Sequence, residues 1–259
     1  MNVEVRWQKL DQDQEGHTVW TERIKQAAFQ PEQTGVLVCD MWDNHWSRGA
    51  AERCAAMAPH MNDVLTALRG QGMTLFHCPS DTMDAYADHP ARLRAMNAPD
   101  VALPAESGPD CPMPDLPVDA ADGGSDTGEL DEHRVWTCQH PAILIDPDRD
   151  FISDVGREIL NVAAVRGITR FLIMGVHTNM CVLRRSFAIV QMVRWNKPIF
   201  LVRDLTDAMY NPARPPYVSH DEGTRLVIAY IEKFWCQTLE SSQLLGEKHA
   251  RIHHDRERP

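Results

Sequence analysis

The chain has 259 residues, 43% of them hydrophobic, which is enough to bury a sizeable core within a single α/β domain. Acidic residues outnumber Lys and Arg by 37 to 26, and the formal net charge of -11 has the wrong sign for a nucleic-acid partner. Neither a signal peptide nor a stretch of about 18 apolar residues is found, so no membrane contact and a cytoplasmic location are expected.

The first half of the chain is predicted to begin with two short strands and then to alternate strands with helices. Residues 1–34 alternate weakly around a turn-like Gly16, which indicates an edge hairpin or a lid. A continuous apolar run at 35–40 is typical of a strand buried on both faces. Helical spacing follows at 49–69, and another strand is predicted at 73–78.

The same strand and helix unit recurs downstream. Further strands are predicted at 142–145, 171–176 and 198–202, and further helices at 153–166, 179–195 and 222–234. Alternating elements of this length imply parallel pairing with right-handed crossovers. The predicted fold class is therefore α/β, a three-layer, doubly wound and mostly parallel sheet flanked by helices.

Three segments are expected: an N-terminal extension over 1–34, an α/β domain over 35–240 and a polar tail over 241–259. An irregular acidic insertion at about 97–140 interrupts the domain, with ten carboxylates and no Lys or Arg between residues 100 and 132. Insertions of this length are either disordered or functional lids. A solvated acidic loop is one interpretation of this segment, and a calcium site among its aspartates is the other.

Polar residues directly follow most of the predicted strands. They are Asp40, Asp81, Asp146, His177 and Asp204. In open parallel sheets, ligands bind beyond the carboxyl ends of the strands. This edge is therefore the predicted functional edge.

One of the seven cysteines is a candidate nucleophile. Cys181 lies just inside the predicted helix that follows the strand 171–176, where the helix N-terminus would stabilise a thiolate and backbone N–H groups would bind an oxyanion. Asp40, at the end of the first buried strand, is placed to deprotonate or orient the thiol. The alternative is a structural cysteine, which is how the others are interpreted.

Three segments together resemble the isochorismatase-like cysteine hydrolases, a superfamily that includes nicotinamidases, N-carbamoylsarcosine amidases and isochorismatases. They are 36–42 with its strand-ending aspartate, the Gly-Val-x-Thr-x-x-Cys-Val segment at 175–182, and 200–204, within a match of about 34–235. The resemblance implies a parallel sheet flanked by helices, a small-molecule substrate and a homo-oligomer.

Carried over by position, the resemblance also implies site residues. Asp40 would be the general base and Cys181 the nucleophile. The peptide between Val176 and His177 would be cis, and the N–H groups of His177 and Cys181 would form the oxyanion hole.

The sequence departs from the family at the third member of the triad, a lysine, because it has no lysine between Lys25 and Lys197. Alignment of the 142–145 strand puts Asp146 in the lysine position, and Arg149 is the neighbour expected to restore a positive charge. Like charges raise each other's pKa, so either one carboxyl stays protonated, with Arg149 or a metal supplying charge, or amidase turnover is lost.

Several residues near the predicted edge are candidates for ligand contacts. The residues predicted to line the substrate pocket are Trp42, His45, Trp46, Arg149 and Asn179, and buried packing is the alternative for Trp42 and Trp46. His177 is expected to touch substrate or donate to Asp146, and a structural hydrogen bond is its alternative.

No cofactor is required, but a divalent metal could be bound by Asp43 and His45 next to Asp40. The family's nicotinamidases place a metal after the second strand, where residues 81–89 differ in spacing. Capping of the following helix, or hydrogen bonds to loop backbone, is the alternative role of Asp43 and His45.

Three functions remain open. The first is hydrolysis of the C–N bond of a small amide or carbamoyl-type compound through a thioacyl-enzyme. The second is a catalytically altered member that binds a small ligand or a protein partner. The third is vinyl-ether hydrolysis of the isochorismatase type, which needs no nucleophile.

Overall fold

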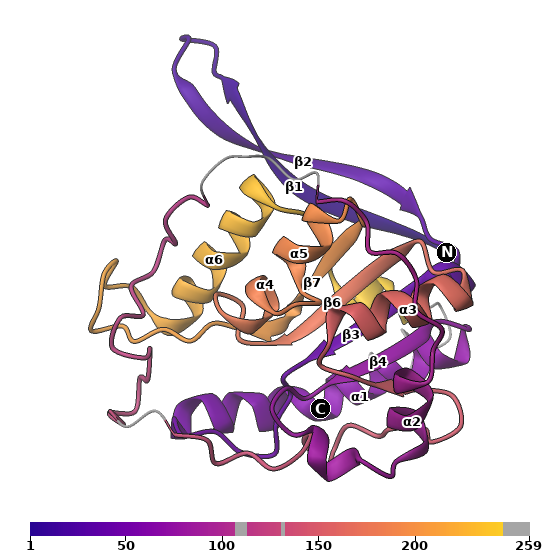
Figure 1. Ribbon diagram of the computed structural model, residues 1–259. Helices are drawn as coiled ribbons and strands as arrows, with labels where there is room; N and C mark the ends of the chain where they lie inside the picture. The colour runs from indigo at the N-terminus through magenta and orange to yellow at the C-terminus, as the bar shows by residue number, and fades with distance from the viewer. Residues whose placement is uncertain (107–112, 131–132, 246–259) are drawn as a thin grey trace, which may run out of the picture.

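The computed structural model describes residues 1–106, 113–130 and 133–245. These residues fold around one eight-stranded sheet in the order β2-β1-β8-β7-β6-β3-β4-β5 (Figure 1). The strands are β1 Asn2–Gln12, β2 Thr18–Ala28, β3 Thr34–Cys39, β4 Thr74–Cys78, β5 Phe151–Ile152, β6 Arg170–Val176, β7 Ile199–Asp207 and β8 Gln237–Leu239. Strands β3 to β8 pair in parallel, whereas β1 pairs antiparallel with both β2 and β8.

Helices cover both faces of the sheet. They are α1 Arg48–Gly70, α2 Pro90–Met96, α3 Gly156–Arg166, α4 Cys181–Arg184, α5 Ile189–Arg194 and α6 His220–Phe234, with short 3-10 turns η1 Pro31–Gln33, η2 Met83–Tyr86 and η3 Ser241–Gln243. The sheet has a hydrophobic core on each face, and alternate residues of β3 point into one or the other. Val36 and Val38 pack with the apolar face of α1, whereas Leu37 and Cys39 pack with residues of α3 to α6. The predicted three-layer, mostly parallel α/β fold is confirmed.

The predicted strand at 142–145 is wrong. This apolar run forms turns and loop, and the next strand is the two-residue β5. Ile143 is buried on the α1 side of the sheet, and the N–H of Leu144 binds the Asn62 side chain 2.9 Å away in α1. Ile143 is therefore the residue of this run that packs against the α1 side, whereas Leu144 is exposed.

The single helix predicted at 179–195 is two short helices, α4 and α5, separated by residues 185–188. The break lies where the chain meets the start of α3. A Cβ on Gly156 would lie 2.0 Å from the carbonyl oxygen of Ser186, so the two segments approach as closely as backbones can. Arg185, the residue that ends α4, has a non-helical backbone conformation.

The predicted edge hairpin is confirmed, although its strands are long, at 11 residues each. Val3 and Val5 at its base are buried in the core, Arg6 pairs with Thr238 of β8, and the turn end extends beyond the body of the molecule (Figure 1). No helix among the described residues is long and apolar enough to cross a membrane. Most of the predicted polar tail, 246–259, lies outside the described residues.

Candidate active site

The carboxyl ends of β3 and β6 meet at the centre of the sheet, where Cys39 pairs with Gly175. Asp40 follows the first strand, and His177 follows the second. The strands approach closely here because Gly175 has a φ of 115° and a Cβ on it would lie 2.0 Å from the Cys39 carbonyl oxygen. Only glycine at 175 therefore lets the two loops come together.

Gly175→Ala is expected to lower the free energy of unfolding by about 3 kcal/mol, because the new methyl group meets backbone and the left-handed φ strains an L-residue. Gly70→Ala is the matched control, since nothing lies within 4 Å of its Cβ position. Urea unfolding of both variants measures the difference. Equal stability of the two variants would contradict the close approach.

Asp40 is fully buried, and its carboxylate is the centre of the site. Oδ1 accepts the backbone N–H of Ser80 at 2.8 Å, and Oδ2 accepts Nε of Arg185 at 2.9 Å. The thiol of Cys181 also hydrogen-bonds this carboxylate. Asp40 has a φ of 47°, a left-handed conformation that is uncommon for a residue with a side chain and that concentrates at functional sites.

Arg185 is the positive charge next to Asp40 and Cys181, and sequence reasoning missed it. Its second contact, from Nη2 to Asp81 at 3.1 Å, holds the guanidinium between two carboxylates. A signal was present, because position 185 lies four residues after Cys181, which places both side chains on one side of a helical turn. The positive charge of the site therefore comes from Arg185 and not from Arg149, the residue expected to supply it.

Asp146 and Arg149, the predicted occupants of the lysine position, lie elsewhere. Arg149 donates to the carbonyl of Arg69 at 2.6 Å and lines a hollow with Gly72 and Met73, which precede β4 at the amino edge of the sheet. Asp146 accepts backbone N–H groups of its own turn. Since neither side chain has a contact with Asp40, their assignment to the site is wrong. The cause is the 142–145 run, which is not a strand.

Burial raises the pKa of both Asp40 and Cys181. The charge of Asp40 raises the pKa of the thiol further, whereas Arg185 lowers the pKa of both groups. Asp40 starts from the much lower ordinary value and loses its proton first. The resting site therefore holds a neutral thiol that donates to a carboxylate paired with a guanidinium. The long helix whose N-terminus was expected to stabilise a thiolate is absent here, since α4 spans only 4 residues.

The loop between β6 and α4 has the predicted backbone arrangement. The peptide between Val176 and His177 is cis. The backbone N–H of His177 hydrogen-bonds the sulfur of Cys181, and the His177 carbonyl accepts N–H groups of Met180 and Val182 at 2.9 and 3.2 Å. A donor is thus already directed at the atom on which an acyl group would be carried.

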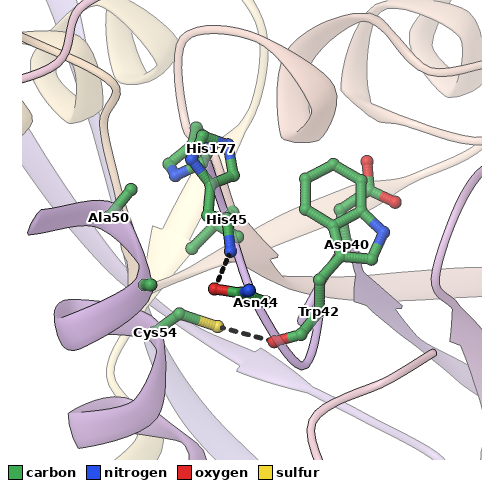
Figure 2. A pocket seen from close by; sticks show the side chains of 9 residues that line it. Asp40, Trp42, Asn44, His45, Ala50, Cys54 and His177 are labelled. Carbon is green, nitrogen blue, oxygen red and sulfur yellow. Dashed lines mark hydrogen bonds between the residues drawn. The ribbon is translucent and has the colours of Figure 1, made fainter. Parts of the chain in front are cut away.

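A small pocket opens next to Asp40. Its empty space is about 190 Å³ including the mouth, and Figure 2 shows the residues that line it: Asp40, Trp42, Asn44, His45, Ala50, Ala51, Cys54, Val176 and His177. The predicted pocket residues Trp42, His45 and His177 are among them. Trp136 stacks on Trp42 at 4.3 Å between ring centroids and on His45 at 5.6 Å, so aromatic rings form one wall.

Two other predicted pocket residues have different positions. Trp46 packs against His45 at 5.4 Å between centroids and is not part of the pocket lining. Asn179 is buried, and its amide exchanges two hydrogen bonds of 2.9 Å with the backbone of Met209. Asn179 therefore anchors the loop after β7 and does not line the substrate pocket.

The predicted metal ligands are occupied by protein groups. Both oxygens of Asp43 accept hydrogen bonds from Thr137, at 2.8 Å from the N–H and 2.6 Å from the hydroxyl, and Nδ1 of His45 accepts the N–H of Ser47 at 3.1 Å. Within the described part of the chain, no three His, Cys, Asp or Glu side chains are arranged to hold a metal ion. Asp43 and His45 are therefore arranged to bind protein groups and not a metal ion.

The described part of the acidic insertion is tied to the body by arginines. Asp126 pairs with Arg53 of α1 at 2.7 Å, and Asp119 pairs with Arg214 at 2.6 Å. Arg53 also contacts Asp207, at the end of β7, at 2.9 Å. These aspartates are partners of protein cations, so the interpretation of 119–126 as a calcium site is not supported.

Similar folds are found among solved structures. A cysteine hydrolase from Pseudomonas syringae pv. phaseolicola aligns over 87% of this chain and 95% of its own, with a TM-score of 0.50 and 16% identity. An isochorismatase family protein from Burkholderia thailandensis aligns over 84% and 97%, with a TM-score of 0.42 and 15% identity. An N-carbamoylsarcosine amidase from Thermoplasma acidophilum aligns over 81% and 96%, with a TM-score of 0.41 and 12% identity.

No family model and no curated protein matches the sequence. At these identities the likeness to solved structures shows the fold alone. The chain has the α/β fold of the isochorismatase-like cysteine hydrolases.

Proposed function

We propose that the protein is a cysteine hydrolase that cleaves the C–N bond of a small amide or carbamoyl-type compound. The observation that carries the proposal is the contact chain from Arg185 through Asp40 to the thiol of Cys181. A nucleophile, a base bonded to it and a group that orients the base are the parts that nucleophilic catalysis requires.

In the proposed reaction Cys181 attacks the substrate carbonyl as its proton passes to Asp40. The oxyanion of the tetrahedral intermediate accepts hydrogen bonds from backbone N–H groups of His177 and Cys181. Collapse of the intermediate breaks the C–N bond, and the leaving amine takes the proton from Asp40. Water then attacks the thioester, gives its proton to Asp40, and releases the acid and the free thiol.

Arg185 takes the place of the lysine that the family resemblance implies. A guanidinium does not lose its proton in a protein, so Arg185 acts as a fixed charge, and all proton transfers pass through Asp40. The absence of the family's lysine is what suggested a catalytically altered binding protein. Arg185 supplies a positive charge in place of that lysine. Hydrolysis is therefore better supported than binding alone.

The test is ammonia release from a panel of small amides and carbamoyl compounds. We expect turnover by the wild-type protein, none by Cys181→Ala, and wild-type rates for Cys138→Ala, which removes a partly exposed cysteine. Ammonia release that survives Cys181→Ala but not Asp40→Asn would contradict the nucleophile and indicate direct attack by water that Asp40 activates. No turnover of any compound would indicate a binding protein.

A further inference from the structure

The ring of His177 carries a buried polar atom that the protein leaves unsatisfied. The residue is only 2% exposed, and its Nε2 is buried without a hydrogen-bond partner. Nε1 of Trp42, which also lines the pocket, donates to the carbonyl of Ser80 at 3.0 Å, whereas Nε1 of Trp136, stacked on Trp42, is also buried without a partner. Burial of a polar atom without a partner costs stability, so such an atom needs an explanation, and a ligand is one.

The position of this ring makes a substrate the natural partner. His177 lines the pocket together with Asp40, and its ring meets that of His45 edge to face at 4.9 Å (Figure 2). The backbone N–H of the same residue contacts the sulfur of Cys181. A substrate held at the thiol therefore lies beside residue 177, whose ring lines the adjoining pocket.

The ring is uncharged near neutral pH. Burial lowers the pKa of His177 to about 3 and that of His45 to about 4. Asp207 raises the pKa of His177, but His45, Arg53 and His220 lower it further. A neutral imidazole offers one donor and one acceptor. The pocket therefore favours an uncharged polar group, and a hydroxyl fits either tautomer because it can donate or accept.

The remaining walls limit the size of the substrate. Ala50, Ala51, Cys54 and Val176 contribute small or apolar surface to a pocket of about 190 Å³, a volume that includes its mouth. The enclosed part of this space is narrow, so it admits a small substituent of a compact substrate and no bulky group.

Building on the hydrolase proposed above, we propose that His177 is a specificity-determining residue whose Nε2 hydrogen-bonds an uncharged hydroxyl on the carbon next to the scissile carboxamide. The substrate class is then compact, neutral 2-hydroxy amides. Such a substrate fills the unsatisfied position of His177, whereas the same amide without the hydroxyl leaves Nε2 unpaired.

The experiment compares lactamide with propanamide, which differ by the one hydroxyl. For the wild-type protein we expect kcat/KM to favour lactamide by about 10- to 100-fold, the effect of leaving a buried group unpaired. His177→Phe should bring the ratio to within about threefold of one, and His177→Gln, which keeps a polar end, should retain part of the preference. His17→Phe, at an exposed hairpin position, should keep the wild-type ratio. An unchanged ratio in His177→Phe would overturn the proposal.

Binding to Cys181→Ser, measured for both amides by ligand-observed NMR, separates this inference from the proposed function. Stronger binding of lactamide that disappears when His177→Phe is added supports the inference even if the wild-type protein hydrolyses neither compound. Cys181-dependent hydrolysis with no preference between the amides overturns the inference and leaves the hydrolase intact. Absence of both binding and turnover of lactamide also overturns the substrate class.

Discussion

Asp40→Asn is expected to lower kcat/KM for amide hydrolysis by about 10³- to 10⁴-fold, because the thiol of Cys181 loses the only base that hydrogen-bonds it within the described residues. Asparagine keeps the size of the side chain and tolerates the left-handed φ, so the backbone of the site should survive. Steady-state kinetics on the best compound of the amide panel measures the loss.

Asp81→Asn is the matched control for Asp40→Asn. Asp81 pairs with the same arginine, is half-exposed and also has a positive φ, yet it has no recorded contact with the thiol. The control should lose less than about fivefold, since exposed ion pairs contribute little. Equal losses in the two variants would show that Asp40 acts only through Arg185.

The pH dependence of kcat/KM also tests the role of Asp40 as the base. Burial raises the pKa of Asp40, which must be ionised to accept the proton, so kcat/KM should fall on the acid side with an apparent pKa above the ordinary 3.8. Because Arg185 lowers this pKa, its removal should move the acid limb to higher pH. An acid limb that does not move when Arg185 is replaced would contradict their coupling.

Arg185→Met is expected to lower kcat/KM by about 10²- to 10³-fold at neutral pH, because a buried carboxylate loses the charge that keeps it ionised. Arg185→Lys should retain activity within about tenfold of wild type, since an ammonium supplies the same charge, although not the second contact to Asp81. Arg184→Met, at the exposed neighbouring position, is the control and should leave activity unchanged.

Stability provides a second measurement on Arg185→Met. Without its partner, Asp40 is a buried unpaired charge, and its folded-state pKa rises further above the unfolded value. The folded state then binds more protons than the unfolded state, so stability falls as pH rises between those two values. Thermal unfolding should show a larger deficit at pH 7 than at pH 5. The same deficit at both pH values would contradict the pairing.

The central part of the fold could be predicted because it is encoded locally. Strands buried on both faces, such as 35–40 and 171–176, are continuous apolar runs, and the helices between them repeat every three to four residues. The pairing of β3 with β6 then brings Asp40 and Cys181 together. An apolar run alone does not distinguish a strand from a loop that packs on a helix, and Ile143 in the run at 142–145 belongs to such a loop.

The rest of the site depends on contacts that leave no local pattern. The pairing of Arg185 with Asp40 spans 145 residues, and that of Arg53 with Asp207 spans 154. The direction of the Arg185 side chain also depends on the end of α4 at this residue. The helix ends where the backbone of Ser186 meets Gly156 at the start of α3. Sequence reasoning assigned the missing charge to Arg149 because it assumed a strand there, whereas the spacing of four from Cys181 was the better guide.

The most direct test of the account is mass spectrometry of the protein quenched during turnover of an amide, with peptide mapping of every cysteine. We expect an added mass equal to the substrate less ammonia, on Cys181 and on no other cysteine, and no such adduct in Cys181→Ala. Turnover of the amide without any adduct, undiminished in Cys181→Ala, would contradict a thioacyl-enzyme and with it the proposed role of the Arg185, Asp40 and Cys181 chain.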